Sequence, residues 1–578
     1  MKRLLLALAA AAALLAADLP TFAHDDHDDD HDGDRRRARF ELLEATIPEI
    51  RKALQSDVIS AERLTRMYLK RIAAYEQAGP AINAYQHVND NALREARQLD
   101  ALNDRHHRRP SRKPLFGIPV LLKDNIDTAD MPTTAGSVAL DGSIPPDDAF
   151  ITKKLRDAGA IILGKGTLTE YANFIAIGMP TGYSSLGDFG FNPYDPRVDP
   201  RTTAPFNDGR PVLQTGGSSS GPAIGVNANL VAISVGTETS GSILSPASAN
   251  GVVGIKPTVG LVSRDGIIPI TADQDTAGPI TRTVTDAAIL LGVLAGYDPN
   301  DPATAACLVP GNCFDDYTKF LKKKALRGAR LAVPPFPANR TAIMEDAIAV
   351  MRAQGAHVEL IDTYDVRIGM PQLGTCVAKP LPTDLTCSTV LLYGFKRDLN
   401  AYLAVTPAAP SQSLAQIIAF NDAHVPPLKY GQAIAIGAEA LDILPGSADT
   451  ARYLADRAED LRRSKLALDG VFNGPDGVQG TDDDFDAVLH LGNANANVPA
   501  KAGYPSVAVP GGFNALSTLT PADPPIGVPF PSDVTFAGPA FSEPKLIALA
   551  YAFEQATLHR VPPASTPPLP SDTVRRRH

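Results

Sequence analysis

The chain contains two loops rich in glycine and serine, Gly216-Gly217-Ser218-Ser219-Ser220-Gly221 and Gly236-Thr237-Glu238-Thr239-Ser240-Gly241-Ser242. A third stretch precedes them, Gly117-Ile118-Pro119-Val120-Leu121-Leu122-Lys123-Asp124-Asn125. Each loop alone has the composition of an ordinary turn. Ser218 and Ser242 stand 24 positions apart, however, and the apolar run of the third stretch ends in Lys123. The order and spacing of the three stretches indicate a site made of one lysine and two serines.

This triple pattern resembles that of the amidase signature family, and the resemblance extends from Leu43 to Glu554. It implies an α/β fold, the amidase signature fold, in which a central mixed β-sheet is sandwiched between layers of α-helices. The implied activity is hydrolysis of carboxamide C–N bonds by a Ser-Ser-Lys triad, with no cofactor and no catalytic metal. Other stretches match the family as framework, namely residues 251–258, 275–279, 503–511 and 542–546.

The resemblance gives each member of the triad a role. The resemblance implies that Lys123 is the base and that Ser242 is the nucleophile that forms the acyl intermediate. Ser218 is implied to pass protons between them and to be held by a cis peptide bond. These residue types suit the chemistry, because a serine hydroxyl is inert until a neighbouring base takes its proton. A free lysine is charged at neutral pH, but burial can lower its pKa by several units. The alternative for Lys123 is a surface lysine paired with Asp124.

The turn before the nucleophile and the relay loop carry further expectations. The backbone amides of Thr239, Ser240 and Gly241 are expected to form the oxyanion hole, where fixed donors stabilise the developing charge. Gly217 and Ser219 are expected to contact the substrate.

Other interpretations of the same loops stay open. Ser219 or Ser220 is the alternative relay, and Ser242 could instead cap a helix. Residues 217–221 also fit the Gly-x-Ser-x-Gly elbow of α/β-hydrolases, with Ser219 as nucleophile. That mechanism needs a later histidine, and the candidates lie in no matching sequence context: His357, His424, His490 and His559.

Alternating helical and strand patterns also predict an α/β architecture. Ser60 is expected to cap a helix. Strands are expected within 84–88, 115–122, 160–163 and 231–235, and helices starting at 89–91, ending at 155–158 and covering 223–228. The stretch 159–166 nearly matches a phosphate-binding loop, but Gly166 stands where a magnesium-binding hydroxyl is required. Lys165 is therefore interpreted as a structural or surface residue.

The ends of the chain differ from its middle. Residues 1–23 predict a signal peptide, with Lys2 and Arg3 before an apolar run and a small-residue cleavage site at 21–23. An uncleaved anchor is the alternative, but the run is shorter than the roughly 20 residues that cross a bilayer. Residues 24–39 are expected to be a disordered His/Asp-rich and Arg-rich tail, 40–562 the amidase domain, and 563–578 a disordered tail. The protein is expected to be secreted or periplasmic.

Charge limits the classes of partner. The formal net charge is −10, and residues 24–34 alone contain seven aspartates. The remaining body is close to neutral, so no basic face for nucleic acid is expected. No membrane contact is expected after signal cleavage, and the oligomeric state is open. The tract 24–34 could bind a divalent metal, with a solvated tail as the alternative.

Four cysteines form two close pairs, Cys307 with Cys313 and Cys376 with Cys387. In an oxidising compartment each pair could close a short disulfide loop, and the even count fits export. A zinc site is the alternative, but the spacings differ from the usual zinc knuckles.

Within the family, residues 236–239 and 261–270 most resemble bacterial peptide amidases, which remove the C-terminal amide of peptides and release ammonia. Export fits this and counts against a glutaminyl-tRNA amidotransferase, which works on tRNA inside the cell. The alternatives are an amidase or esterase for fatty or aryl amides, and a catalytically silent secreted binding protein on the same fold. Three stretches depart from the family: an insertion at 195–214, an acidic loop at 473–486 that could bind calcium or be plain surface, and 489–495.

Overall fold

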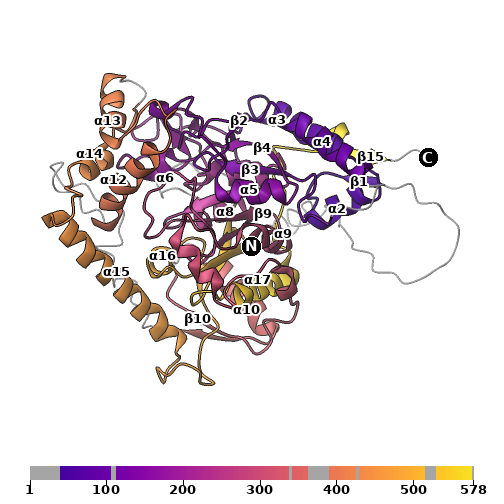
Figure 1. Ribbon diagram of the computed structural model, residues 1–578. Helices are drawn as coiled ribbons and strands as arrows, with labels where there is room; N and C mark the ends of the chain where they lie inside the picture. The colour runs from indigo at the N-terminus through magenta and orange to yellow at the C-terminus, as the bar shows by residue number, and fades with distance from the viewer. Residues whose placement is uncertain are drawn as a thin grey trace, which may run out of the picture. The chain divides into compact units, whose positions relative to one another are not determined.

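A large mixed sheet runs through the protein (Figure 1). The computed structural model describes residues 39–105, 112–336, 341–361, 389–424, 428–514 and 529–575. The strands of this sheet are β2 Tyr85–Val88, β3 Pro119–Lys123, β4 Ile161–Gly166, β7 Ile233–Glu238, β8 Val253–Lys256, β9 Thr276–Thr281, β10 Arg330–Val333, β11 His357–Leu360, β12 Ala487–Leu491, β13 Ser506–Asn514 and β14 Phe530–Ala537. Their order across the sheet is β11-β10-β12-β14-β13-β8-β9-β7-β3-β4-β2.

Helices flank the sheet, which confirms the predicted α/β architecture (Figure 1). Their bounds are α2 Ile47–Gln55, α3 Ala61–Tyr75, α4 Ala92–Arg105, α5 Phe150–Asp157, α6 Glu170–Asn173, α7 Ser220–Asn227, α8 Leu244–Asn250, α9 Val284–Leu294, α10 Thr341–Ala353, α12 Thr389–Ala404, α13 Leu414–Ala423, α14 Ala433–Glu439, α15 Ala448–Phe472, α16 Asn497–Ala502 and α17 Glu543–Thr557. No helix in the described ranges is long and apolar enough to span a bilayer.

The sheet brings two of the three motifs to one edge. β3 and β7 are parallel neighbours, with Val120 opposite Ile233. β3 ends at Lys123 and β7 ends at Glu238. Because parallel strands end at the same edge of a sheet, the lysine and the start of the nucleophile turn lie side by side. The loop before α7 joins them there, because Ser218 in this loop accepts a hydrogen bond from Lys123 Nζ.

Most expected elements are present, with shifted bounds. Ser60 caps α3 through its side chain, which accepts a hydrogen bond from the Arg63 amide. The strand expected over 115–122 begins only at Pro119, because Leu115 to Ile118 form a turn with a hydrogen bond from the Ile118 amide to the Leu115 carbonyl. Apolar composition alone does not separate a buried turn from a buried strand.

The C-terminal segment corrects one prediction. Residues 563–575 are not a disordered tail: β15 Thr573–Arg575 pairs with β1 Arg39–Glu41. Arg71 and Asp572 form a fully buried ion pair at 2.6 Å. The buried ion pair and the strand pairing hold this segment in the folded body. The predictions for residues 1–38 and for Cys376 and Cys387 lie outside the described residues.

The segment from α12 to α15 forms a helical group beside the sheet (Figure 1). α12 packs its apolar face on residues that follow β4, and Phe395 makes edge contacts with Tyr171 and Phe174. Leu392, Leu399 and Ile270 belong to the same buried cluster. The helical group thus packs against the segment after β4 and against the loop before β9.

The insertion and the acidic loop are both ordered by their own side chains. The insertion at 195–214 carries three Asp-x-Arg ion pairs: Asp195–Arg197, Asp199–Arg201 and Asp208–Arg210. In the loop 473–486, Asp483 accepts hydrogen bonds from Thr481 and from the Asp476 amide. No group of three or more His, Cys, Asp or Glu suited to a metal occurs in the described residues.

Cys307 and Cys313 are joined by a disulfide bond, as expected for this pair.

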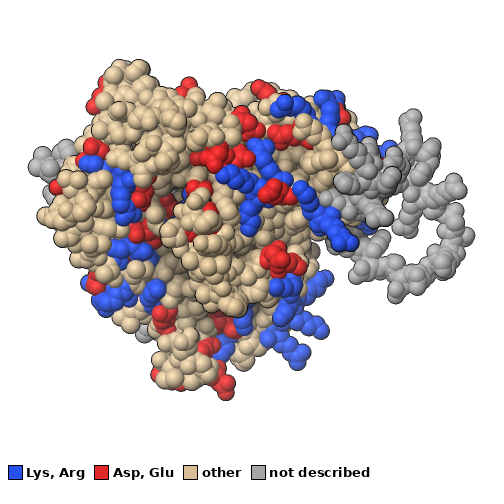
Figure 2. All heavy atoms as spheres, viewed as in Figure 1, with Lys and Arg blue, Asp and Glu red and all other residues tan. Residues whose placement is uncertain are grey.

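Figure 2 shows lysine and arginine interspersed with acidic side chains on the face drawn. That mixture gives no broad basic area on this face.

Candidate active site

Lys123 lies where β3 and β7 end, beside the two serine loops. Its Nζ atom donates to Ser218 Oγ at 2.7 Å, to Thr237 Oγ1 at 2.9 Å and to the Thr237 carbonyl at 3.2 Å. Asn125, two residues along, donates to the same Thr237 hydroxyl at 3.1 Å. The lysine amine is therefore aimed at the relay serine by the end of β7.

The environment of Lys123 favours its neutral form. The side chain is fully buried. Burial lowers the pKa of Lys123 to about 7, against the opposing effect of Asp275 and Glu238. The alternative pairing with Asp124 is wrong: Asp124 lies 3.4 Å from Lys165, which is itself buried. A surface role for Lys165 is therefore excluded, and its structural role is confirmed.

Ser218 follows a cis peptide bond, between Gly217 and Ser218. The carbonyl of Ser218 accepts a hydrogen bond from the Thr169 amide at 3.0 Å. Gly217 has no room for a side chain, because a Cβ atom there would meet Thr169 Oγ1 at 2.5 Å and Thr181 at 3.0 Å. Gly217 is only partly buried, so its backbone borders open space beside the relay serine.

Ser219 has a different place from the one expected. Its hydroxyl donates to the Thr237 carbonyl at 3.1 Å and accepts from the Thr237 amide at 3.2 Å, and the residue is fully buried. Its amide donates to the Ser242 carbonyl at 3.1 Å. Ser219 thus joins the two serine loops rather than contacting substrate. Because its hydroxyl is bound to β7, the Gly-x-Ser-x-Gly elbow with Ser219 as nucleophile is also wrong.

Ser242 stands at the turn before α8 and is buried. Glu238 organises this turn: its carboxylate accepts hydrogen bonds from the amides of Gly241 at 2.6 Å, Ile243 at 2.7 Å and Leu244 at 3.1 Å. Burial raises the pKa of Glu238, and the nearby Lys256 opposes that shift. Ser242 is not the cap of α8, since the capping position is Ile243.

The Glu238 contact also corrects one member of the expected oxyanion hole. The Gly241 amide already donates to Glu238, so it does not point freely at a substrate oxygen. Thr239 is held on its other sides, by Gln274 Nε2 on its carbonyl at 3.0 Å and by Asp275 on its hydroxyl. Thr239 and Ser240 are the expected donors that this finding leaves.

Three residues with roles in this geometry were not singled out in the sequence. Thr237 receives the lysine amine, Glu238 caps the nucleophile turn, and Asp275 holds Thr239. Thr237 and Glu238 stand in the loop 236–242, and Asp275 stands in the framework stretch 275–279. Their position in these stretches was the signal in the sequence that could have pointed to them. Their roles depend on contacts between segments distant in sequence, which spacing does not reveal.

Comparisons with known proteins agree with this fold. The family described as Amidase matches residues 63–379. A probable amidase of Arabidopsis thaliana is 38% identical over 539 residues, covering 92% of this chain and 93% of the relative. The crystal structure of an amidase family protein from Bacillus anthracis matches with a TM-score of 0.75 and 33% identity, over 90% of this chain and 92% of that one.

A second solved structure shares the same architecture. The native peptide amidase of Stenotrophomonas maltophilia matches with a TM-score of 0.73 and 37% identity, over 90% of this chain and 99% of that one. The chain therefore belongs to the amidase signature family and is an amidase, a hydrolase of amide C–N bonds.

Proposed function

We propose that the protein is a secreted serine amidohydrolase that removes the C-terminal amide of peptides through Lys123, Ser218 and Ser242. The observation that carries the mechanism is the 2.7 Å contact between Lys123 Nζ and Ser218 Oγ at a fully buried lysine. A neutral amine in that position can accept the hydroxyl proton of Ser218. Ser218 in turn takes the proton of Ser242.

The proposed reaction has two halves. Ser242 Oγ attacks the amide carbon, and the oxyanion forms beside the amides of the turn at Thr239 and Ser240. The relay returns the proton to the amide nitrogen, the C–N bond breaks, and ammonia leaves with an acyl-serine behind. Water then attacks the acyl carbon, the relay passes the water proton to Ser242 Oγ, and the bond between the acyl carbon and Ser242 Oγ breaks to release the peptide carboxylate.

Similarity to a peptide amidase over nearly its whole length supports the peptide substrate. Export is supported by the N-terminal sequence, with its basic start, apolar run and small-residue cleavage site. The disulfide between Cys307 and Cys313 fits an oxidising compartment. Amidated peptides met outside the cytoplasm would be natural substrates for such an enzyme.

The substrate class is tested with a panel of compounds given to the mature protein. The panel contains a C-terminally amidated peptide, a long-chain fatty amide, an aryl amide and a simple ester. Mass spectrometry should show the amidated peptide gaining about 1 Da as the amide becomes a carboxylate, at the highest kcat/KM of the four. A higher kcat/KM for the fatty or aryl amide would overturn the peptide assignment while leaving the triad in place.

A further inference from the structure

A loop between β8 and β9 connects the helical group to the nucleophile turn. Residues 270–275 of this loop, here called the strap, close on themselves: the Asp275 carboxylate accepts the amides of Ile270 at 2.8 Å and Thr271 at 2.9 Å. The other oxygen of Asp275 accepts the Thr239 hydroxyl. One buried carboxylate therefore fixes both the strap and the first residue after β7.

The strap holds Thr239 at two points. Besides the bond from its hydroxyl to Asp275, its carbonyl accepts Gln274 Nε2 at 3.0 Å. Thr239 stands three residues before Ser242 and carries one of the amides proposed for the oxyanion. A residue whose side chain and carbonyl are both held has little freedom to turn its amide away.

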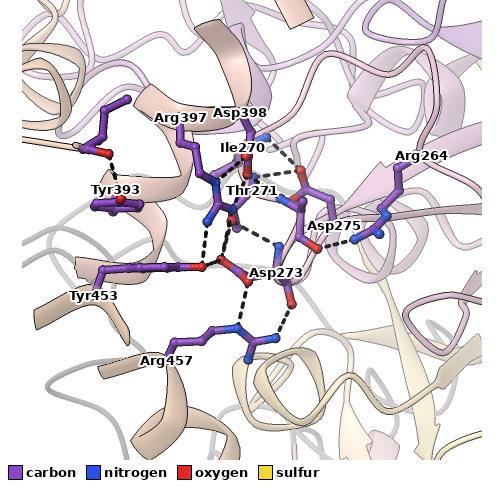
Figure 3. A network of polar contacts seen from close by, with 12 residues as sticks. Arg264, Ile270, Thr271, Asp273, Asp275, Tyr393, Arg397, Asp398, Tyr453 and Arg457 are labelled. Carbon is purple, nitrogen blue, oxygen red and sulfur yellow. Dashed lines mark hydrogen bonds and ion pairs between the residues drawn. The ribbon is translucent and has the colours of Figure 1, made fainter. Parts of the chain in front are cut away.

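The outer side of the strap is fastened by the helical group, as Figure 3 shows. Asp273 accepts from Tyr453 Oη at 2.8 Å and from Arg457 Nε at 2.9 Å, both on α15. Arg397 of α12 lies 3.3 Å from the same carboxylate. Its neighbour Asp398 accepts the Ala272 amide at 2.7 Å. The strap thus has ion pairs on one side and the catalytic turn on the other.

The charges around Lys123 give Asp275 a second effect. Two carboxylates act on Lys123: Asp275, and Glu238 at the end of β7. The positive charge of Lys256 on β8 lowers the pKa of Glu238, and that of Arg264 in the loop between β8 and β9 lowers the pKa of Asp275; both effects act against burial. Burial raises the pKa of Asp275 to about 6, so this carboxylate is charged at neutral pH and above.

We propose that Asp275 is a positioning residue for the reaction: its carboxylate fixes Thr239 in the oxyanion turn, two residues from the Thr237 that binds Lys123, and adds a negative charge to this part of the site. This inference rests on the proposed function for its kinetic consequences only. A purely structural carboxylate would brace β9 without acting on the lysine. Removal of the Asp275 charge would then leave the pH dependence of the enzyme unchanged.

The experiment compares three variants with the native protein. Asp275→Asn removes the charge at nearly constant size, and Thr239→Val removes only the hydroxyl that Asp275 holds. Asp286→Asn is the matched control, because Asp286 is also buried and also accepts a backbone amide, from Ile47 at 2.8 Å. The readouts are kcat, KM and the pH profile of kcat/KM with an amidated peptide, beside thermal unfolding.

For Asp275→Asn the expected result is a fall in kcat on the order of tenfold or more with KM little changed, because a loosened donor acts on the transition state. The acid limb of its kcat/KM profile should move to lower pH, since Lys123 loses an attracting charge. Thr239→Val should lower kcat without moving that limb. Asp286→Asn should leave both unchanged. A native kcat or an unmoved acid limb in Asp275→Asn would overturn the proposal.

A second measurement does not depend on activity or on the substrate. Lysine labelled with ¹³C at Cε reports the titration of each amine by NMR, and the Lys123 signal is the one missing in Lys123→Met. The Lys123 titration should move to lower pH in Asp275→Asn and stay in place in Asp286→Asn. No movement would refute the inference even if the native protein hydrolysed none of the amides tested, which would count against the proposed function alone.

If Asp275→Asn does not fold, Thr239→Val and Gln274→Met still decide the matter, because each removes one of the two bonds on Thr239. Native kcat in both would overturn the positioning of Thr239. A reduced kcat in either, with native unfolding temperature, would support it.

Discussion

The proposed mechanism depends on Lys123, because its amine is buried, faces Ser218 and has its pKa lowered to about 7 by burial. A lysine with the ordinary pKa of about 10.4 would be charged throughout the neutral range and could not accept a proton. Burial at the end of an interior strand therefore gives Lys123 the neutral form that the proposed base needs.

The pH dependence follows from this shift. Below pH 7 Lys123 is protonated and cannot accept the Ser218 proton, and above pH 7 it is neutral. We expect kcat/KM for an amidated peptide to rise with pH through an acid limb near 7. Initial rates of ammonia release from about pH 5 to about pH 9 measure this, and a rate independent of pH across that range would contradict the base role of Lys123.

Lys123→Met should separate activity from stability. It removes the amine and keeps the apolar stem, so we expect a loss of kcat/KM of roughly 10³-fold, within the range known for a missing base. The folded pKa of Lys123 lies below its unfolded value, so the unfolded state binds an extra proton between about pH 7 and 10. Burying the lysine therefore costs stability at pH 7, and this cost falls as pH rises through that window.

The methionine variant should thus unfold at a higher temperature than the native protein at pH 7. Lys545→Met is a control at an exposed lysine and should change neither property by much. Lower thermal stability in Lys123→Met would contradict the burial argument, and retained activity would contradict the mechanism.

At the scale of single elements, Glu238 and α8 form the part of the site that the sequence did not reveal. Three amides at the start of this helix converge on one carboxylate. The partial positive charge at a helix N-terminus favours a carboxylate there, and buried amides left without an acceptor would cost free energy. Glu238 thus fixes the turn that carries Ser242 into the start of α8.

Glu238→Gln keeps the shape but replaces one accepting oxygen by an NH₂ group that cannot accept. We expect a loss of stability of about 1 to 3 kcal/mol and a clear fall in kcat. Glu49→Gln is the control, since Glu49 caps α2 at an exposed position. Urea unfolding midpoints and kcat measure both effects. A Glu238→Gln protein with native kcat would show that the turn is held without this carboxylate.

The helices and strands differ in how well the sequence predicts them. Strong local patterns predict their elements correctly, as at Ser60 and α3. The stretch 115–122 resembles one strand because its apolar residues are buried throughout, although its first half is a turn. The motifs predict the proposed triad residues, but Thr237 and Asp275 make contacts that form only when distant strands meet.

Ser219 and Gly241 show the same limit within the site. Both stand in the serine loops, where composition alone suggests contact with a substrate. In the structure the Ser219 hydroxyl binds the Thr237 backbone, and the Gly241 amide binds Glu238. Which way a loop side chain or amide points is decided by its partners, and sequence spacing carries no record of them.

At the scale of the whole molecule, the last described residues return to the first. β15 pairs with β1, and Arg71 of α3 holds the segment through Asp572 and through the carbonyls of Thr566 and Pro567. Both charged groups are fully buried. The segment after α17 is therefore part of the folded body.

Asp572→Asn leaves the Arg71 charge buried without its partner. Such a change typically costs about 3 to 5 kcal/mol, so the urea midpoint should fall clearly. Arg39→Ala breaks the exposed pair with Glu41 and should cost less than about 1 kcal/mol. Equal midpoints for the two variants would contradict the anchoring role assigned to the C-terminal segment.

In the proposed mechanism, the buried Lys123, the relay Ser218 and a turn held by Glu238 and Asp275 make Ser242 a nucleophile toward amides. The most direct test is ammonia release from a C-terminally amidated peptide by the mature protein, measured beside Ser242→Ala at equal concentration and equal thermal stability. The account predicts release by the native protein and none above background by the variant. Equal release by both would contradict it.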